Sequence, residues 1–294
     1  MPGATIDSEF LYFSLKQKVP TLQAIGSGAT FSEVSKTTVE GFEVPLPPLA
    51  EQKRIAAILN EQMGAVERAR AAAEAQLEAA KALPAAYLRA VFSSPEAKQW
   101  PRKPMGELCE VVNGFGFAEH LQGRRDLPYP FVKVSDMNAS GAETVVTGAV
   151  NTVDDSILRT IGARTFPPGT VIFPKVGGAL LTNKKRILGV EASFDNNVMG
   201  LVPKNVESRW LYYWMLNFDL RTLSNTQALP SIRQSEVAAL ALPLPPVEEQ
   251  KRIAVMLNEQ MASAERARKA IEEELDTINK LPAALLRRAF AGGL

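Results

Sequence analysis

The sequence has little of the residues on which most catalytic and metal sites depend. Its 294 residues include a single cysteine, Cys109, and a single histidine, His120. One cysteine excludes an internal disulfide and a multi-thiolate metal site, which fits a reducing compartment. His120 lies in a polar stretch without the turn that presents a nucleophilic serine or cysteine, so it does not indicate a catalytic triad.

Other absences narrow the class of protein further. Basic and acidic residues nearly cancel, 33 against 32, so the net charge does not point to nucleic acid. The first residues lack the features of a signal peptide, and no run of about 18 apolar residues occurs. Gly114-Phe115-Gly116 lacks the third glycine of a dinucleotide fingerprint. We therefore expect a cytoplasmic protein with no membrane contact and no catalytic residue, metal site or cofactor of its own.

What the chain does contain is one stretch that occurs twice. Residues 45–92 and 243–290 align without a gap and share 29 of 48 residues. Each copy opens with Pro-Leu-Pro-Pro, and Glu-Gln-Lys-Arg-Ile-Ala follows at residues 51–56 and 249–254. Alternating prolines fix the backbone in extended conformations, so each copy begins with a stiff joint rather than with a helix.

Beyond each joint, apolar residues recur at alternating spacings of three and four, which is typical of a coiled-coil seam. Each helix should run for about 35 residues, until Pro84 or Pro282 ends or kinks it. A surface helix of a compact globule is the simpler alternative, but two matched copies favour packing against each other. The predicted contacts of these helices with each other or with a partner protein are Ile55, Leu59, Val66, Leu83, Ile253, Leu257, Ile271, Ile278 and Leu281.

The region between the copies has the pattern of a mixed domain. Short β-rich runs and turn residues alternate, and helical patterns return only towards its end. We expect strands within residues 129–134, 144–150, 170–173 and 198–202, and helices at 208–223 and around 231–240. Because long crossover helices between the strands are missing, the fold class is α+β.

The start of the chain resembles the end of this mixed domain. Residues 7–13, an acidic residue and a serine followed by an aromatic helix pattern, resemble residues 207–213. The sequence therefore divides into a domain remnant (1–44), a first spacer helix (45–93), a complete mixed domain (94–242) and a second spacer helix (243–294).

Basic residues of the mixed domain fall in loops rich in glycine and asparagine. Phosphate contacts need positive side chains beside backbone amides, and base contacts need Arg, Lys, Asn or Gln on exposed loops. Residues 105–242 hold 13 basic and 13 acidic residues, so an ordinary charged surface is the alternative. The predicted DNA contacts are Arg124, Arg125, Lys175, Lys184, Lys185 and Arg186.

The two proline joints with their Glu-Gln motifs resemble the entries to the conserved helices of the specificity subunit of type I restriction-modification systems. The helix exits at residues 83–92 and 281–290 are similar to those of the family. Successive landmarks of its target recognition domain are matched at residues 129–137, 168–173 and 196–203. The resemblance covers essentially the whole chain.

This resemblance implies a non-catalytic subunit of a family in which two target recognition domains, each reading half of a split sequence in double-stranded DNA, are held apart by two antiparallel helices. One mixed target recognition domain would be flanked by two long helices packed as an antiparallel coiled coil. Those helices would also bind the modification (methyltransferase) subunits. S-adenosylmethionine, ATP and magnesium would be used by the partner methyltransferase and restriction (endonuclease) subunits.

The chain departs from the family pattern in one respect, because its first recognition domain is reduced to the last 44 residues. A homodimer would restore two recognition domains and read a symmetric split site. The alternatives are a coiled-coil assembly protein without DNA binding and a nonfunctional truncated specificity subunit. An enzyme such as a fused methyltransferase or nuclease is less compatible with the sequence, which lacks an Asn-Pro-Pro-aromatic motif and a nuclease carboxylate cluster.

Overall fold

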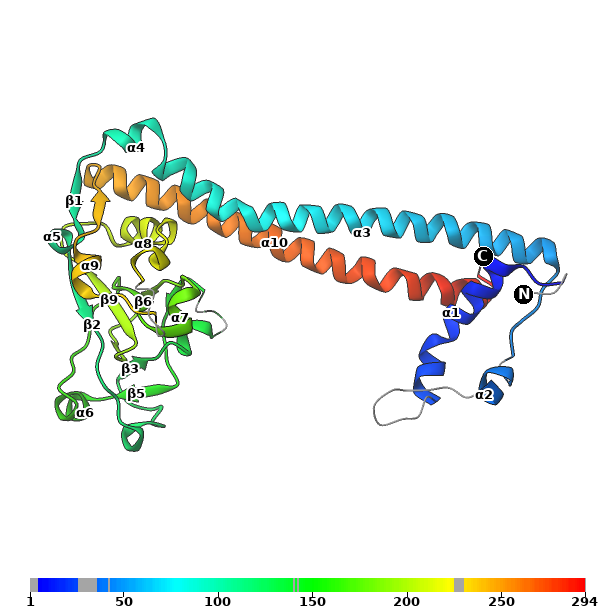
Figure 1. The fold of residues 1–294 in the computed structure, drawn as a ribbon, viewed down its shortest axis with the longest axis horizontal. Coiled ribbons are helices and arrows are strands. Elements are labelled where there is room, and N and C mark those ends of the chain that lie inside the picture. Colours follow the sequence, from blue (N-terminus) through cyan, green and yellow to red (C-terminus); the bar gives the residue numbers. More distant parts are fainter. Residues whose placement is uncertain are drawn as a thin grey trace. The chain divides into compact units, whose positions relative to one another are not determined.

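The computed structural model describes residues 5–25, 36–41, 43–139, 141, 143–224 and 230–293. The chain forms two compact units (Figure 1). The helical unit comprises residues 1–82 and 264–294, and the mixed unit comprises residues 83–263. The division into four segments made from the sequence stays a prediction, and residues 1–4, 26–35 and 42 of its first segment lie outside the described residues.

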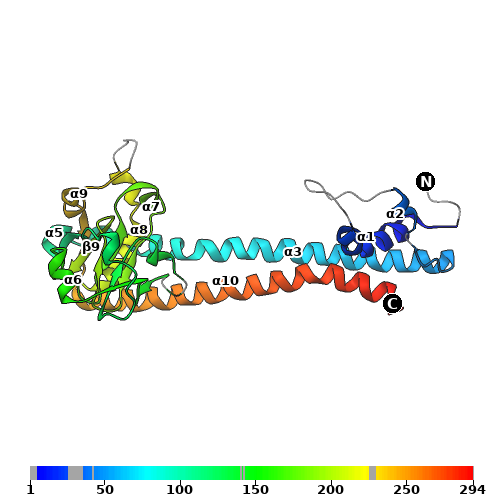
Figure 2. The same cartoon turned by 90° about the horizontal axis from the view of Figure 1, so that it is seen from below.

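The helical unit is built from α1 (Ser8–Ile25), the short α2 (Lys36–Glu40) and parts of two long helices. These are α3 (Leu49–Phe92) and α10 (Val247–Phe290), and each of them also contributes to the mixed unit. In Figures 1 and 2, α3 and α10 lie side by side, and the first turns of α1 adjoin them within the helical unit, from which α1 projects in Figure 1. No described helix is long and apolar enough to span a bilayer.

The two long helices run in opposite directions. In the helical unit, Leu59 of α3 shares a buried cluster with Leu286 of α10, whereas Val66 packs with Ile278. In the mixed unit, Leu88 of α3 belongs to the same buried cluster as Leu257. Rising residue numbers in α3 therefore meet falling numbers in α10, and the predicted antiparallel pairing is confirmed.

We expected Pro84 and Pro282 to end or kink the long helices, and neither proline ends its helix. Both helices are 44 residues long and continue through Pro84 and Pro282. A proline removes one backbone donor and crowds the preceding turn. The turns that follow are nevertheless held in place, because Leu88 and Leu286 on them are only 6% and 5% exposed.

Most predicted seam residues are buried. Leu83 and Ile271 are half-buried, but Leu281 is 40% exposed, so its assignment to the seam was wrong. Because the helix continues past Pro282, the seam passes from Ile278 to residues one turn beyond the proline. The buried seam residues among those predicted are Ile55, Leu59, Val66, Ile253, Leu257 and Ile278.

The strands of the mixed unit form three sheets. The largest has the order β2-β9-β6-β7-β4, the second β5-β3-β8, and the third pairs β1 with β10. The bounds are β1 (Arg102–Pro104), β2 (Cys109–Asn113), β3 (Tyr129–Val132), β4 (Val145–Val146), β5 (Asn151–Val153), β6 (Val171–Pro174), β7 (Arg186–Leu188), β8 (Ser193–Phe194), β9 (Val198–Pro203) and β10 (Ala241–Pro243).

Short helices connect and cover these sheets. Their bounds are α4 (Pro95–Gln99), α5 (Met105–Leu108), η1 (Glu119–Leu121), η2 (Asp136–Asn138), α6 (Asp155–Thr160), α7 (Gly177–Leu181), α8 (Ser208–Asn217), η3 (Leu220–Leu223) and α9 (Gln234–Ala238). The predicted helical stretches thus hold α8 with η3, and α9. Of the four stretches predicted to be strands, residues 129–134, 170–173 and 198–202 overlap β3, β6 and β9. Residues 144–150 contain only the two-residue strand β4.

Alternating side chains of the five-stranded sheet supply two cores. Phe173 and Met199 point to a cluster shared with α8 and α10, whereas Ile172 and Val198 point to a cluster with the three-stranded sheet. This period of two is the pattern expected of a strand covered on both faces. The α+β fold class is therefore confirmed, with the sheet between helices and a second sheet.

The match between residues 7–13 and 207–213 has a structural counterpart. The Asp7 carboxylate caps α1 by accepting from the Phe10 backbone N–H at 3.0 Å, and the Glu207 carboxylate caps α8 by accepting from Trp210 at 2.6 Å. Each capped helix meets the end of a long helix through an aromatic pair. The ring centroids of Phe10 and Phe290 are 5.5 Å apart.

Candidate nucleic-acid interface

One end of the five-stranded sheet collects polar side chains. The pairings Asn113 with Met199, Pro174 with Val198, and Ile172 with Arg186 are all antiparallel. The ends of β2 and β6 therefore lie beside the starts of β9 and β7. We call this the polar end of the sheet, and it comprises Asn113, Lys175, Lys184, Arg186, Asn197 and Gln234, the last of which is hydrogen-bonded to Asn113.

Three side chains at the polar end form a chain of hydrogen bonds. The Lys175 ammonium donates to Asn113 Oδ1 at 2.9 Å, and Asn113 Nδ2 donates to Gln234 Oε1 at 2.9 Å. The Gln234 Nε2 group then donates to the backbone carbonyl of Val111. Asn113 and Gln234 are exposed, so this chain lies at the surface.

Backbone pairing holds Gln234 in place. Gln234 is the first residue of α9, and the segment before it runs beside the end of β6. The backbone N–H of Ile232 donates to the Lys175 carbonyl at 3.0 Å, and the N–H of Gly177 donates to the Pro230 carbonyl at 2.7 Å. The amide of Gln234 is therefore positioned by the same strand end that carries Lys175.

A shallow cavity of about 390 Å³ opens beside these hydrogen-bonded side chains. The Lys133 ammonium on its wall donates to Gln122 Oε1 at 2.6 Å. Asp195 is 9% exposed, and burial raises the pKa of its carboxyl above the usual range. The lining residues are Lys133, Val134, Ser135, Val176, Gly178, Ala179, Asp195 and Asn197.

The basic run 184–186 divides into surface and interior groups. The Lys184 ammonium donates to Asn138 Oδ1, and the Arg186 guanidinium donates to the Lys185 carbonyl at 2.7 Å; both side chains are half-buried. Burial lowers the pKa of both groups. Lys184 and Arg186 thus retain a place at the surface of the polar end.

Lys185 does not. Its side chain is fully buried, and its Nζ donates to Asn183 Oδ1 and to the Phe218 carbonyl, both at 2.7 Å. Burial lowers the pKa of this amine to about 7. A neutral amine has two N–H groups, which match these two acceptors. The prediction that Lys185 contacts DNA is corrected here, because its amine points into the protein.

Arg124 and Arg125 are exposed and lie between η1 and β3. Their loop is tied to β5 because the Thr152 backbone N–H donates to the Arg124 carbonyl at 2.8 Å. Gln122 in the same loop accepts from Lys133, so the loop adjoins the cavity. The structure thus places Lys175, Lys184 and Arg186 at the polar end, and it places the loop that carries Arg124 and Arg125 beside the cavity.

The prediction from sequence missed the amide side chains of this region. Asn113 and Gln234 were not among the predicted contacts, because positive charge was the signal on which that prediction rested. The signals that were present are an Asn-Gly pair at residues 113–114 and a pair of asparagines at residues 196–197. Both pairs are typical of turns at strand ends.

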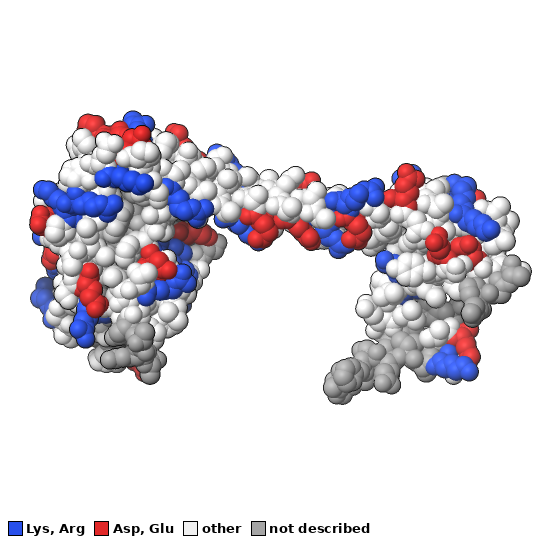
Figure 3. All heavy atoms as spheres, turned by 45° about the horizontal axis from the view of Figure 1, so that its top comes forward, with Lys and Arg blue, Asp and Glu red and all other residues white. Residues whose placement is uncertain are grey.

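On the face of the mixed unit shown in Figure 3, the described basic residues do not form one continuous patch. Figure 3 shows Lys and Arg side chains interspersed with Asp and Glu on the face of the mixed unit that it presents. Among the described residues, no group of three His, Cys, Asp or Glu side chains is placed to hold a metal ion. Cys109 is buried, and burial raises the pKa of its thiol to about 12, so its reactivity as a nucleophile is low.

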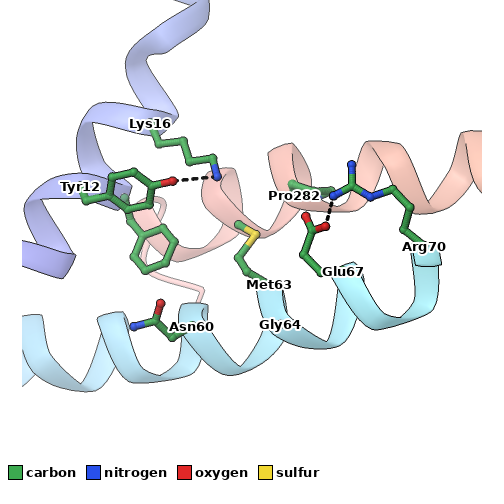
Figure 4. Close-up of a pocket in the computed structure, with 9 residues that line it drawn as sticks. Tyr12, Lys16, Asn60, Met63, Gly64, Glu67, Arg70 and Pro282 are labelled. Carbon is green, nitrogen blue, oxygen red and sulfur yellow. Dashed lines mark hydrogen bonds and ion pairs between the residues drawn. The ribbon is translucent and has the colours of Figure 1, made fainter. Parts of the chain in front are cut away.

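A second cavity, of about 520 Å³, lies in the helical unit between α1, α3 and α10 (Figure 4). Its charged side chains are engaged with their neighbours. The Lys16 ammonium donates to the Tyr12 hydroxyl at 3.1 Å, and Arg70 pairs with Glu67. Because these charged groups already have partners, this cavity is a weaker candidate for a ligand site than the polar end of the sheet.

Comparison with known proteins agrees with this architecture. The family model described as "Type I restriction modification DNA specificity domain" matches residues 3–73 and 97–276. This chain therefore belongs to the type I restriction-modification DNA specificity family. It is 23% identical to the type I restriction enzyme EcoDI specificity subunit of Escherichia coli, over 98% of this chain and 70% of that protein. The MjaVIII specificity subunit of Methanocaldococcus jannaschii is also 23% identical, over 86% and 63% respectively.

Solved structures share the fold. The HsdS subunit from Thermoanaerobacter tengcongensis superimposes with a TM-score of 0.64 at 21% identity, over 99% of this chain and 71% of that one. A chain from work described as "Structural basis underlying complex assembly and conformational transition of the type I R-M system" has a TM-score of 0.77 at 22% identity, over 97% and 71%. The chain spans between 60% and 70% of the length of the first three curated relatives it matches.

Proposed function

We propose that this chain is the non-catalytic DNA-recognition subunit of a type I restriction-modification complex, and that it directs partner subunits to a split target site in double-stranded DNA. The observation that carries the proposal is the polar end of the sheet, where Lys175, Asn113 and Gln234 are joined at the surface. Ordered amides beside cations are the groups that base and phosphate contacts require.

The remaining parts of the complex follow from membership of the family. The modification subunits would bind S-adenosylmethionine and methylate the target. The restriction subunit would use ATP and magnesium to translocate and cut DNA. The complex would act in the cytoplasm.

A homodimer that brings two recognition domains together is also part of this proposal. Because the seam residues of α3 and α10 are buried within one chain, the dimer contact would use other surfaces. Size-exclusion chromatography with light scattering measures this directly, for the chain alone and with a modification subunit. If every complex contains one copy of the chain, the homodimer is contradicted, but the proposed DNA recognition is not.

DNA recognition is tested with purified chain and coexpressed modification subunits. Fluorescence anisotropy with random duplex DNA at low salt measures binding, and methylome sequencing of the expressing cells measures target recognition. We expect binding together with one methylated split motif. A coiled-coil scaffold, which the balanced charge would suit, gives neither binding nor a motif. A nonfunctional specificity subunit joins the modification subunits but yields no motif.

A further inference from the structure

We infer that Asn113 and Gln234 are base-reading residues, and that the base they fit is an adenine exposed in the major groove. The inference rests on the proposed function and names the side chains within the polar end that would supply sequence discrimination. The cations around them, Lys184 and Arg186 among others, would contact phosphate and position the domain.

The direction of the hydrogen-bond chain is fixed at both ends. A protonated Lys175 only donates, so the Asn113 atom that it contacts must be the amide oxygen. The Val111 carbonyl only accepts, so the Gln234 atom that it contacts must be the amide nitrogen. Asn113 Nδ2 is left to donate to Gln234 Oε1, which agrees with both ends. Neither amide can flip without breaking the chain.

The main chain beneath Asn113 is equally constrained. Asn113 pairs with Met199 at the end of β2, and the Gly114 backbone N–H donates to the Val198 carbonyl at 3.1 Å. A Cβ atom at Gly114 would lie 2.0 Å from the Asp195 carbonyl oxygen, so only glycine fits. The exposed amide of Asn113 is therefore held at a fixed position, as a residue that reads one base edge must be.

Each of the two amides has donors and acceptors that the hydrogen bonds among Lys175, Asn113 and Gln234 do not use. A carboxamide has two N–H donors and two acceptor lone pairs, and the chain uses one of each on Asn113 and on Gln234. Adenine presents an acceptor, N7, beside a donor, the N6 amino group, in the major groove, and Asn or Gln pairs with both. The exposed position of both residues leaves the remaining donor and acceptor available for this interaction.

The test compares Asn113→Asp and Gln234→Ala with the wild-type chain, all coexpressed with modification subunits. Asn113→Asp keeps the shape of the side chain but removes its donor. Asn205→Ala is the matched control, because Asn205 is an exposed amide beyond the opposite end of β9. Methylome sequencing defines the motif, and anisotropy measures affinity for that motif and for random duplex. Thermal unfolding of each purified variant verifies that it folds.

For both test variants we expect the motif to lose discrimination at an adenine-containing position. The ratio of specific to random binding should fall about 5- to 150-fold, which corresponds to removal of one bidentate pair of hydrogen bonds to a base. Random binding should stay within about twofold of wild type, because the phosphate contacts remain. An unchanged motif and ratio in either folded variant would overturn the inference. A wild-type chain that neither binds DNA nor yields a motif would instead overturn the proposed function, and the inference with it.

Discussion

Gln52 and Gln250 lie 198 residues apart and make matching hydrogen bonds. Gln52 Oε1 accepts from the Asp7 backbone N–H at 2.8 Å, and its Nε2 donates to the Pro47 carbonyl at 2.8 Å. Gln250 Oε1 accepts from the Glu207 backbone N–H at 2.9 Å, and its Nε2 donates to the Pro245 carbonyl at 2.8 Å. Each glutamine thus ties a proline joint to the capping residue of the helix that packs beside it.

Replacing either glutamine with alanine should lower the free energy of unfolding by about 1–3 kcal/mol. Both side chains are buried, at 0% and 3% exposed, and their removal leaves a backbone donor and a carbonyl without a partner. Urea denaturation measures the destabilisation, and hydrogen exchange locates it. Gln52→Ala should deprotect α1, whereas Gln250→Ala should deprotect α8. Gln76→Ala, at an exposed position of α3, is the control, and equal destabilisation of all three variants would contradict the role of the two buried glutamines.

The aromatic pair of Phe10 with Phe290 should show measurable coupling. Phe10 is 1% exposed, and the pair joins α1 to the last turn of α10. A double-mutant cycle with Phe10→Ala and Phe290→Ala should give a coupling energy of about 0.5–1.5 kcal/mol. Leu281→Ala in place of Phe290→Ala should give a coupling near zero, because Leu281 is exposed on the same helix. A cycle without coupling for the phenylalanine pair would mean that α1 is held by other contacts.

The long helices were predictable because each copy repeats one apolar period over many turns. The exposure of Leu281 was not predictable, because its apolar spacing alone placed it on the seam, whereas in the structure it is 40% exposed and the helix continues through Pro282. A proline lowers helix stability locally, but burial of Leu286 beyond it depends on tertiary packing that the local sequence does not contain.

The polar end of the sheet was predictable only in part, for a different reason. Lys175 and Lys184 were found because basic residues in glycine-rich loops are visible in the sequence. Asn113 and Gln234 are separated by 121 residues and meet only through sheet pairing. Lys185 is the same type of residue as Lys184, but neighbouring side chains point in different directions, and the sequence does not reveal which one points inwards.

Lys184 and Arg186 should govern the salt dependence of DNA binding rather than its sequence preference. Replacing both with alanine should weaken binding to every duplex, and the slope of log affinity against log salt should become shallower by about 1 for each phosphate that is no longer neutralised. Anisotropy titrations at several salt concentrations measure the slope. Lys204→Ala, an exposed lysine beyond the other end of β9, is the control. An unchanged slope in the double variant would remove Lys184 and Arg186 from the DNA interface.

Lys185 should make the stability of the protein depend on pH in a defined direction. Burial lowers the pKa of its amine from 10.5 to about 7 in the folded chain. Between these values the unfolded chain binds more protons than the folded chain, so the free energy of unfolding should rise with pH, by at most about 1.4 kcal/mol per pH unit. Below pH 7 the amine is protonated in both states, and its contribution to the slope disappears.

The measurement is urea denaturation of wild type and Lys185→Met at pH 6, 7, 8 and 9. Methionine fills a similar volume without an ionisable group, so the variant should lack the rise in stability above pH 7. The free energy of unfolding of wild type, relative to that of the variant, should therefore increase as the pH rises above 7. Parallel profiles would mean that Lys185 is protonated when folded. In that case the hydrogen bonds to Asn183 and Phe218 would hold a charged ammonium in the interior.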